Sequence, residues 1–160
     1  MSGLGSAPLP PLAPDDHLLG AGAGEPLIVY ADYECPYCAA LHARLLAGER
    51  RWAFRHFPVR SKHPRAWAAA CAAEAAALQA AFEPMHLALY ADQARLDDPH
   101  LWERARALGL DVARFDADRR SEAVLARVRR DFESGVRAGV VTTPTVFERG
   151  SIRPAAPSEA

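Results

Sequence analysis

Hydrophobic residues in the first third of the chain predict two neighbouring β-strands joined by a helix. Residues 27–32, LIVYAD, are rich in β-branched and aromatic side chains and directly follow Pro26, a pattern typical of a buried strand. Residues 51–58, RWAFRHFP, alternate large apolar side chains with polar or small ones, which predicts a second strand that ends at its final proline. Between the two strands we expect a helix over residues 35–46, because Gly48 follows as a stop signal.

Beyond residue 64 the apolar residues take helical spacing up to about Gly139. Trp67, Cys71, Leu78 and Phe82 recur at intervals that should place them on one buried helix face. The expected boundaries are a helix break at Pro84, helices over 85–94, 97–108 and 120–138, a short helix in GLDVARF, and two short strands around Gly150.

The order of these elements predicts an α/β fold with a helical subdomain inserted into a small sheet. We assign the sheet-forming core to residues 27–58 and 142–153, and the inserted helical subdomain to residues 59–141. Residues 1–26, rich in Pro, Gly and Ala, are expected to form a flexible arm. A chain of 160 residues, half of them apolar, is expected to form one compact domain.

Charge and composition argue against several classes of protein. The net charge of −1 gives no overall attraction for nucleic acid or for an anionic membrane. No stretch approaches the roughly 18 consecutive apolar residues that a membrane-spanning helix needs. The first residues have neither the basic start nor the apolar core of a secretory signal, so we expect a cytoplasmic protein. Stable structural disulfides are rare in the cytosol, so a close pair of cysteines there is more typical of redox or metal chemistry.

Such a pair occurs in YECPYCAALH, residues 33–42. Cys35 and Cys38 stand at positions i and i+3 of the expected helix, on one face, so their sulfurs can meet. Pro36 lies in the first turn, where its missing N–H costs nothing. Cys38 continues into an apolar stripe that should face the core, which predicts a shielded Cys38 and an exposed Cys35 at the start of the helix.

An attacking cysteine needs a lowered pKa, and the sequence predicts a moderate lowering for Cys35. A drop of two units requires about 2.7 kcal/mol, whereas a helix N-terminus usually supplies about 0.3–1 kcal/mol. Hydrogen-bond donors within the motif must therefore supply the rest. Asp32 and Glu34 are expected to oppose the effect, because nearby negative charge disfavours a thiolate.

A metal site is the alternative use of the two cysteines. Zinc sites generally pair one C-x-x-C with a second Cys or His doublet at short spacing. Here Cys71 stands alone and the histidines are scattered, while His42, at i+4 from Cys38, offers only a third ligand. We therefore favour a redox pair and assign no metal ligands and no cofactor beyond the two cysteines.

Several motifs in the same order resemble one known family. They are DYECPYC after a strand, FRHFPV after a helix, HPRAWAAACAAEAA at the start of the helical block, MHLALY, LGLDVARF and VTTPTVF. Together, over residues 15–147, they resemble the DsbA-like branch of the thioredoxin superfamily, thiol–disulfide oxidoreductases with a helical insertion in a thioredoxin fold. C-P-Y-C also occurs in glutaredoxins, and the long helical block before TTPT is what favours the DsbA-like branch.

The resemblance assigns a role to several residues. It implies that Cys35 is the nucleophile and Cys38 the resolving thiol, with Pro36 and Tyr37 tuning the redox potential. It also implies a cis bond between Thr143 and Pro144, beside the cysteine pair, with backbone presented to a bound substrate. The expected partners are thiol or disulfide groups of proteins or small molecules.

The end of the sequence departs from the family. Members normally follow the last hairpin with an amphipathic helix, whereas ERGSIRPAAPSEA contains Pro154 and Pro157 and is too short for one. We expect the usual final helix to be missing and one sheet face to be uncovered. That face predicts either a homodimer or packing of the N-terminal arm over the gap.

Other reactive residues have simpler interpretations. Cys71 is expected to be an inert core thiol. His42 is expected at the surface or half-buried, with a proton shuttle beside the thiols as the alternative. His63 should merely precede a helix, and Asp32 should be a solvated carboxylate at a strand end, with proton transfer as its alternative.

Two functions from different classes follow. The first is a dithiol–disulfide oxidoreductase that acts through the C-P-Y-C motif, with Cys38 resolving a mixed disulfide formed by Cys35. The second is a non-catalytic module of the same fold that binds a partner and uses the cysteines as a redox-gated or metal-gated switch.

Overall fold

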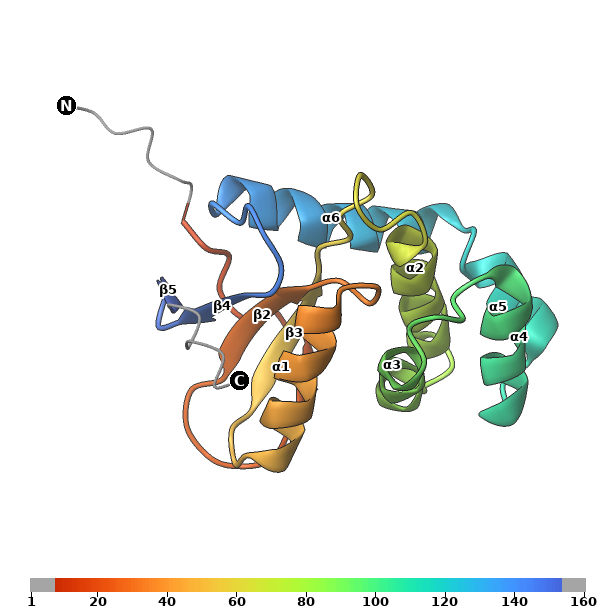
Figure 1. The fold of residues 1–160 in the computed structure, drawn as a ribbon, viewed down its shortest axis with the longest axis horizontal. Coiled ribbons are helices and arrows are strands. Elements are labelled where there is room, and N and C mark those ends of the chain that lie inside the picture. Colours follow the sequence, from red (N-terminus) through yellow and green to blue (C-terminus); the bar gives the residue numbers. More distant parts are fainter. Residues whose placement is uncertain (1–7, 154–160) are drawn as a thin grey trace.

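A computed structural model of the chain describes residues 8–153. Five strands form one mixed sheet, accompanied by six helices, in the described part of the chain (Figure 1). The elements in order are β1 (His17–Leu19), β2 (Leu27–Ala31), α1 (Pro36–Ala47), β3 (Trp52–His56), α2 (Ala66–Ala77), α3 (Phe82–Ala91), α4 (Asp98–Ala107), α5 (Val112–Asp118), α6 (Glu122–Arg137), β4 (Thr145–Glu148) and β5 (Ser151–Arg153). Of these helices, α4 and α5 lie beyond α2 and α3, away from the sheet (Figure 1).

The sheet has the strand order β1-β3-β2-β4-β5, with β2 at its centre. β2 runs parallel to β3, through α1 as the crossover, and antiparallel to β4. Every residue of β2 is buried, as expected for a strand covered on both faces. The α/β fold with a helical insertion before the last hairpin is confirmed.

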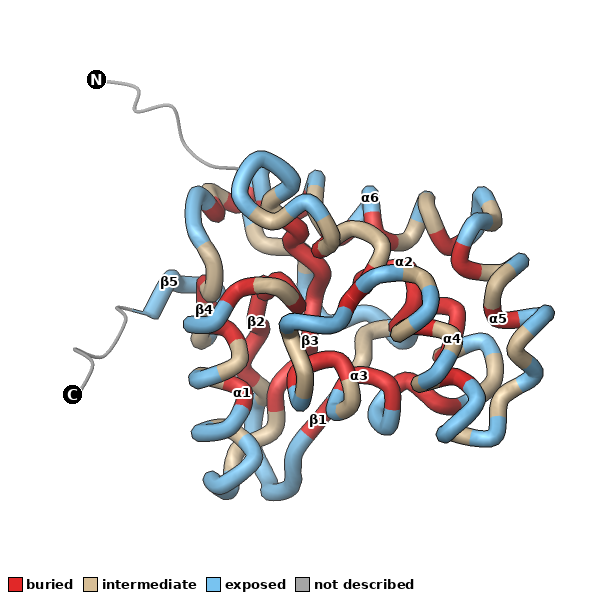
Figure 2. Tube along the Cα trace, turned by 45° about the vertical axis from the view of Figure 1, so that its right-hand side comes forward, coloured by how far each residue is buried: buried red, intermediate tan, exposed pale blue. Residues whose placement is uncertain are grey.

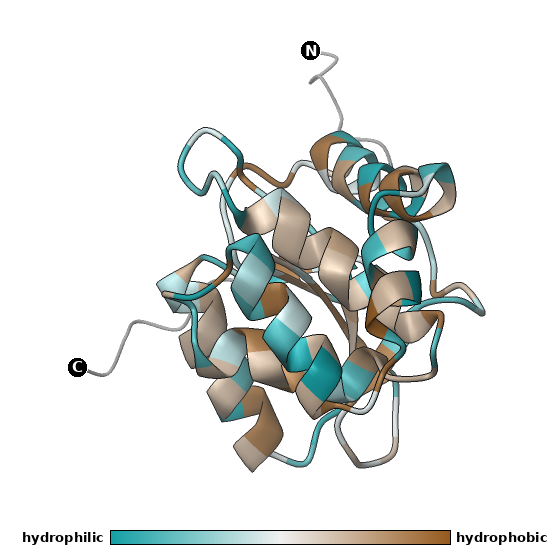
Figure 3. Cartoon of the chain, turned by 90° about the vertical axis from the view of Figure 1, so that its right-hand side faces the viewer, coloured by the Kyte–Doolittle hydropathy of each residue, from teal (hydrophilic) through white to brown (hydrophobic). Residues whose placement is uncertain are grey.

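Alternate residues of β2 point into two separate apolar clusters. Val29 and Ala31 join the larger cluster, which α1, α2 and α3 cover. Ile28 and Tyr30 join the smaller one on the opposite face, where Phe132 of α6 packs. The burial colours follow this arrangement, with buried segments gathered along β2, β3 and α2 (Figure 2). Seen from the helical side, apolar strand segments lie behind helices that mix hydrophobic and hydrophilic positions (Figure 3).

α6 approaches the sheet closely because it has a glycine at the contact. A Cβ at Gly135 would stand 2.7 Å from the Phe57 ring and 2.9 Å from the Tyr30 ring. The hydroxyl groups of Tyr30 and Ser134 are 2.8 Å apart at the same contact. A small residue at this position therefore sets the distance between helix and sheet.

The helix break expected at Pro84 occurs earlier. α2 ends at Ala77, and Ala80 takes a positive φ of 58° in the turn that follows. α3 begins at Phe82, so Pro84 lies in its first turn, where a backbone N–H has no intrahelical partner to lose. Leu78, expected on the buried face, lies beyond the helix and is 51% exposed.

The expectation of a flexible arm is wrong for its later residues. β1 pairs antiparallel with β3, and Asp16 forms a buried ion pair with Arg55 at 2.9 Å. Leu9 packs against the smaller apolar cluster, so the N-terminal segment covers part of that sheet face. The absence of a final helix concerns residues 154–160, which lie outside the described residues.

Candidate active site

The first turn of α1 holds both cysteines of the C-P-Y-C motif. Cys35 is the N-cap residue, with extended backbone (φ −78°, ψ 120°), and Pro36 is the first helical residue. Because an N-cap side chain faces the free N–H groups of the first turn, the Sγ of Cys35 accepts a hydrogen bond from the backbone N–H of Cys38 at 3.4 Å. All three cysteines are free thiols in this structure.

The loop before β4 completes the site from the other end of the chain. β4 pairs with β2, which brings residues 142–144 beside the start of α1. The Sγ of Cys35 lies 3.7 Å from the carbonyl oxygen of Thr143, which can accept from the thiol. The Thr143–Pro144 bond is cis, so both the isomer and the position of this loop agree with the prediction.

The pKa of Cys35 is lowered from an ordinary 9.0 to about 6. The largest cause is a hydrogen bond from the Cys38 thiol, and burial opposes it. The Thr143 side chain and the backbone N–H groups of Tyr37 and Cys38 lower the pKa further. Donors within the motif thus supply most of the effect, as the small size of the helix dipole contribution predicted.

Exposure at the motif differs from the prediction. Cys38 is 1% exposed, as expected for the shielded thiol, but Cys35 is only 3% exposed. Tyr37, between them, is 75% exposed. Burial raises the pKa of the Cys38 thiol far above its ordinary value, so the two thiols differ in acidity rather than in accessibility.

The two acids beside the motif are engaged elsewhere. Asp32 is 1% exposed, and its Oδ2 accepts from the backbone N–H of Val59 at 2.8 Å and contacts His63 Nδ1 at 2.9 Å. Glu34 pairs with Arg65, whose Nε donates to its Oε1 at 3.2 Å. The predictions of a solvated Asp32 and of an uninvolved His63 are therefore wrong, and neither acid is among the main influences on the Cys35 pKa.

Sequence reasoning missed the residues of α3 that support the motif. Gln93, just past α3, donates from Nε2 to the carbonyls of Tyr33 and Cys35, both at 2.9 Å. His86 Nδ1 lies 2.7 Å from the Tyr33 hydroxyl. His86 lies within the motif MHLALY and Gln93 follows it. The motif indicated the family, but nothing in its sequence predicted that these two residues contact the cysteine motif.

His42 is buried, 8% exposed, rather than at the surface or half-buried. Its ring stacks on Tyr90 with centroids 4.8 Å apart, and its Nδ1 is 3.3 Å from His86 Nε2. Cys71 is 3% exposed, and burial raises its pKa to about 11, which agrees with an inert core thiol.

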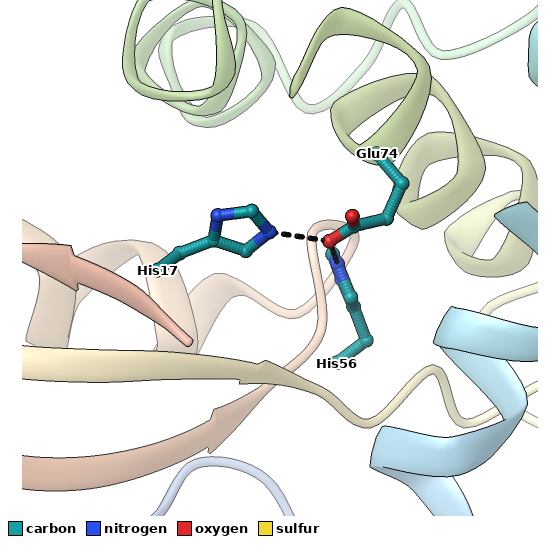
Figure 4. A group of neighbouring side chains, drawn as sticks. All are labelled: His17, His56 and Glu74. Carbon is teal, nitrogen blue, oxygen red and sulfur yellow. Dashed lines mark hydrogen bonds and ion pairs between the residues drawn. The ribbon is translucent and has the colours of Figure 1, made fainter. Parts of the chain in front are cut away.

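A second polar cluster joins β1, β3 and α2 away from the cysteines. His17 Nε2 and His56 Nε2 both lie on the same Oε1 of Glu74, at 2.6 and 2.8 Å (Figure 4). A histidine that binds metal through Nε2 almost always donates its Nδ1–H to an acceptor. The buried Nδ1 of His56 has no partner among the described residues. The donor set therefore fits a hydrogen-bonded cluster, in which both imidazoles donate to Glu74, better than a metal centre.

Sequence comparison finds a matching family model and several curated relatives. The family model described as thioredoxin matches residues 13–159. A Na(+)/H(+) antiporter NhaA of Herminiimonas arsenicoxydans is 41% identical over 150 residues, which are 88% of this chain and 24% of the antiporter. NhaA 3 of Salinispora tropica is 40% identical, again over 88% of this chain and 22% of the antiporter. The chain spans about a quarter of the length of these curated relatives, and no helix among its described residues is long and apolar enough to cross a membrane.

Solved structures share the fold. A thioredoxin-like oxidoreductase of Silicibacter pomeroyi superimposes with a TM-score of 0.75 at 25% identity, covering 89% of this chain and 84% of the other. Oxidised BdbD of Bacillus subtilis gives a TM-score of 0.73 at 17% identity, covering 94% and 90%. The second likeness concerns the fold alone.

Proposed function

Because this chain belongs to the DsbA-like branch of the thioredoxin family, we propose that it is a thiol–disulfide oxidoreductase that exchanges disulfides through Cys35 and Cys38. The proposal rests on the contrast between the two cysteines. Cys35 is the N-cap residue of α1, its pKa is lowered, and its Sγ lies beside the Thr143 carbonyl. Cys38, about one helical turn later, is a buried thiol whose raised pKa keeps it protonated. A thiolate and a protected resolving thiol are the two reactants that disulfide exchange needs.

The reaction runs in two displacements. The Cys35 thiolate attacks one sulfur of a substrate disulfide, forms a mixed disulfide and releases the first substrate thiolate. Cys38 then loses its proton and attacks the Sγ of Cys35, which forms the Cys35–Cys38 disulfide and releases the second substrate thiolate. Two electrons pass to the substrate, whose thiolates take up protons, and the reverse sequence oxidises a dithiol.

Backbone groups near the cysteines suit an extended polypeptide as substrate. The backbone carbonyl of Thr143, in the loop before β4, lies 3.7 Å from the Sγ of Cys35, and Tyr37, two residues along the chain from Cys35, is largely exposed. We infer that a substrate segment lies along this loop, with Pro36 and Tyr37 shaping the approach to the thiolate. We also propose a cytoplasmic location, where the redox poise would favour reduction or isomerisation of disulfides.

A glutathione redox titration tests the proposal. The Cys35–Cys38 couple is followed by thiol alkylation and mass, alongside turnover of a model protein disulfide. We expect one reversible two-electron transition and catalytic turnover, both lost in Cys35→Ser and both kept in Cys71→Ser, whose thiol is buried away from the site. Stoichiometric oxidation without turnover would support the alternative, a partner-binding module with a redox-gated pair.

A further inference from the structure

The resolving step needs a proton acceptor for Cys38. Its thiol is 1% exposed and strongly disfavours ionisation, because burial penalises the thiolate. A thiol in that state attacks a mixed disulfide only when a neighbouring group removes its proton. The structure limits which group that can be.

A cavity of about 10 Å³ lies against Cys38, between α1, the sheet and Tyr90 of α3. This is about the room that one water molecule needs. Most of its wall is aliphatic or aromatic, as at Val29 and Phe54. Besides Cys38, the ionisable side chains that line it are His42 and Tyr90.

Neither Asp32 nor Tyr90 fits the task. The carboxylate of Asp32 is used by three donors, the backbone N–H groups of Glu34 and Val59 and the ring of His63, and it does not line the cavity. Burial raises the pKa of Tyr90 well above its ordinary value, so its hydroxyl stays protonated and is no base. His42 is what remains.

The position of His42 suits a base. It follows Cys38 by one helical turn, at i+4 on the same face of α1. Burial lowers the pKa of its ring, so the imidazole is neutral near pH 7 and has a free lone pair. At 8% exposed it retains some contact with solvent, through which a proton can leave.

The groups packed around His42 hold the ring and contribute no negative charge. They are Cys38 on its own helix, His86 and Tyr90 on α3, Trp52 on β3, and Tyr33 behind His86. Burial also lowers the pKa of His86, so it is neutral and its Nε2 can accept from His42 Nδ1–H. That hydrogen bond leaves His42 Nε2 as the proton acceptor.

We propose that His42 is the base of the resolving step and takes the Cys38 thiol proton within the cavity that both residues line. The S–H bond of Cys38 breaks, its proton binds His42 Nε2, and the thiolate attacks the Sγ of Cys35. The resulting imidazolium then yields the proton to solvent or to the leaving substrate thiolate. The proposal rests on the disulfide exchange proposed above and assigns its second step.

Stopped-flow reaction of the reduced full-length chain with an aromatic disulfide separates the two steps. Attack by Cys35 releases one coloured thiolate, and attack by Cys38 on the mixed disulfide releases the second. The test variant is His42→Asn, whose amide can still donate to His86 but cannot take a proton. The matched control is His100→Asn on α4, outside the site.

In H42N we expect an unchanged first release and a second release slowed on the order of 100-fold, the usual contribution of a general base. H100N should match the wild type in both. An unchanged second release in H42N, or an equal slowing of both releases as in a merely structural role, would overturn the proposal. Absence of the first release in the wild-type chain would instead refute the function on which it rests.

The wild-type chain gives a second measurement that needs no folded variant. Once Cys35 is in the mixed disulfide it cannot titrate, so an acid loss in the second release comes from Cys38 or from its base. Unassisted ionisation of Cys38, whose pKa is far above its ordinary value, would make the rate rise steadily with pH, whereas a base makes it level off above the pKa of the base. We expect that rate to fall as the pH drops through the lowered pKa of His42, below 6.5. A second release that stays constant down to pH 4, or that rises only with the ionisation of a free thiol, contradicts a role for His42.

Discussion

The carbonyl oxygen of Thr143 lies 3.7 Å from the Sγ of Cys35, although 108 positions separate the two residues. The pairing of β4 with β2 produces this contact, since Tyr30 and Thr145 are opposite one another in the sheet. The reactive sulfur is therefore bounded by α1 on one side and by the loop before the last hairpin on the other.

The acidity of Cys35 should depend on Cys38. Alkylation of Cys35 by iodoacetamide, followed by mass at increasing pH, should be half-maximal near pH 6. In Cys38→Ala the midpoint should rise by about one unit or more, equivalent to at least about 1.4 kcal/mol, because the largest lowering contribution is lost. Glu34→Gln is the control and should leave the midpoint in place, because Arg65 already pairs with Glu34. Equal midpoints in C38A and the wild type would contradict this account.

The same ionisation should make the stability of the reduced protein depend on pH. The folded-state pKa of Cys35, about 6, lies below its ordinary 9.0, so the thiolate's stabilisation is fully present above pH 9 and is lost as the pH falls through 6. The difference in unfolding free energy between reduced wild type and Cys35→Ala should therefore grow from pH 6 to pH 9. Urea unfolding under a phosphine reductant measures it, and a flat difference would exclude the lowered pKa.

Glu74 should stabilise the fold by accepting from both His17 and His56. In Glu74→Gln the neutral amide replaces the carboxylate that both imidazoles share, so at least one buried N–H loses a good acceptor. The substitution should lower the free energy of unfolding by about 1–3 kcal/mol. The hydrogen bonds hold the pKa of Glu74 well below its usual range, so its contribution is present above about pH 4.5 and declines as the pH falls through the lower folded-state value. Chemical unfolding at pH 7 should show the loss for E74Q and not for Glu83→Gln, an exposed control on α3, and the loss for E74Q should be smaller in acid.

A methyl group at Gly135 should push α6 away from the sheet. Helix propensity alone would make Gly135→Ala favourable by up to about 1 kcal/mol, but the new Cβ meets the Phe57 and Tyr30 rings below 3 Å. We expect a net loss of about 1–3 kcal/mol in unfolding free energy, typical of overpacking. Glu133→Ala, on the exposed side of the same helix, should be neutral, and a stabilised G135A would show that the contact is looser than described.

The parts of the structure that the sequence predicted share strong local signals. The buried strand 27–31 and the first turn of α1 follow from β-branched residues, a proline at the first helical position and the cysteine spacing. The helices α4 and α5 follow from Asp N-cap residues and, in α4, a first-turn proline. In each case the deciding residues are within a few positions of one another.

The parts that it missed depend on contacts between distant residues. β1 is three residues long and is held by pairing with β3 and by the Asp16–Arg55 ion pair, which no local pattern reveals. Asp32 is in a strand-end sequence that usually faces solvent, and only the packing of residues 59–63 against it buries the carboxylate. The contact of His42 with His86 likewise spans 44 positions and arises only when α3 packs on α1.

The wall of the cavity beside Cys38 includes the indole of Trp52, which is 1% exposed and 6.2 Å from the His42 ring. A buried chromophore thus stands next to the sulfur whose bonding changes in each catalytic cycle. Indole emission should report the redox state of the protein without a label. With Trp67 and Trp102 replaced by Phe, the emission of Trp52 alone would let the oxidation and reduction of the cysteine pair be followed in real time, in mixtures of thiols and disulfides of any composition.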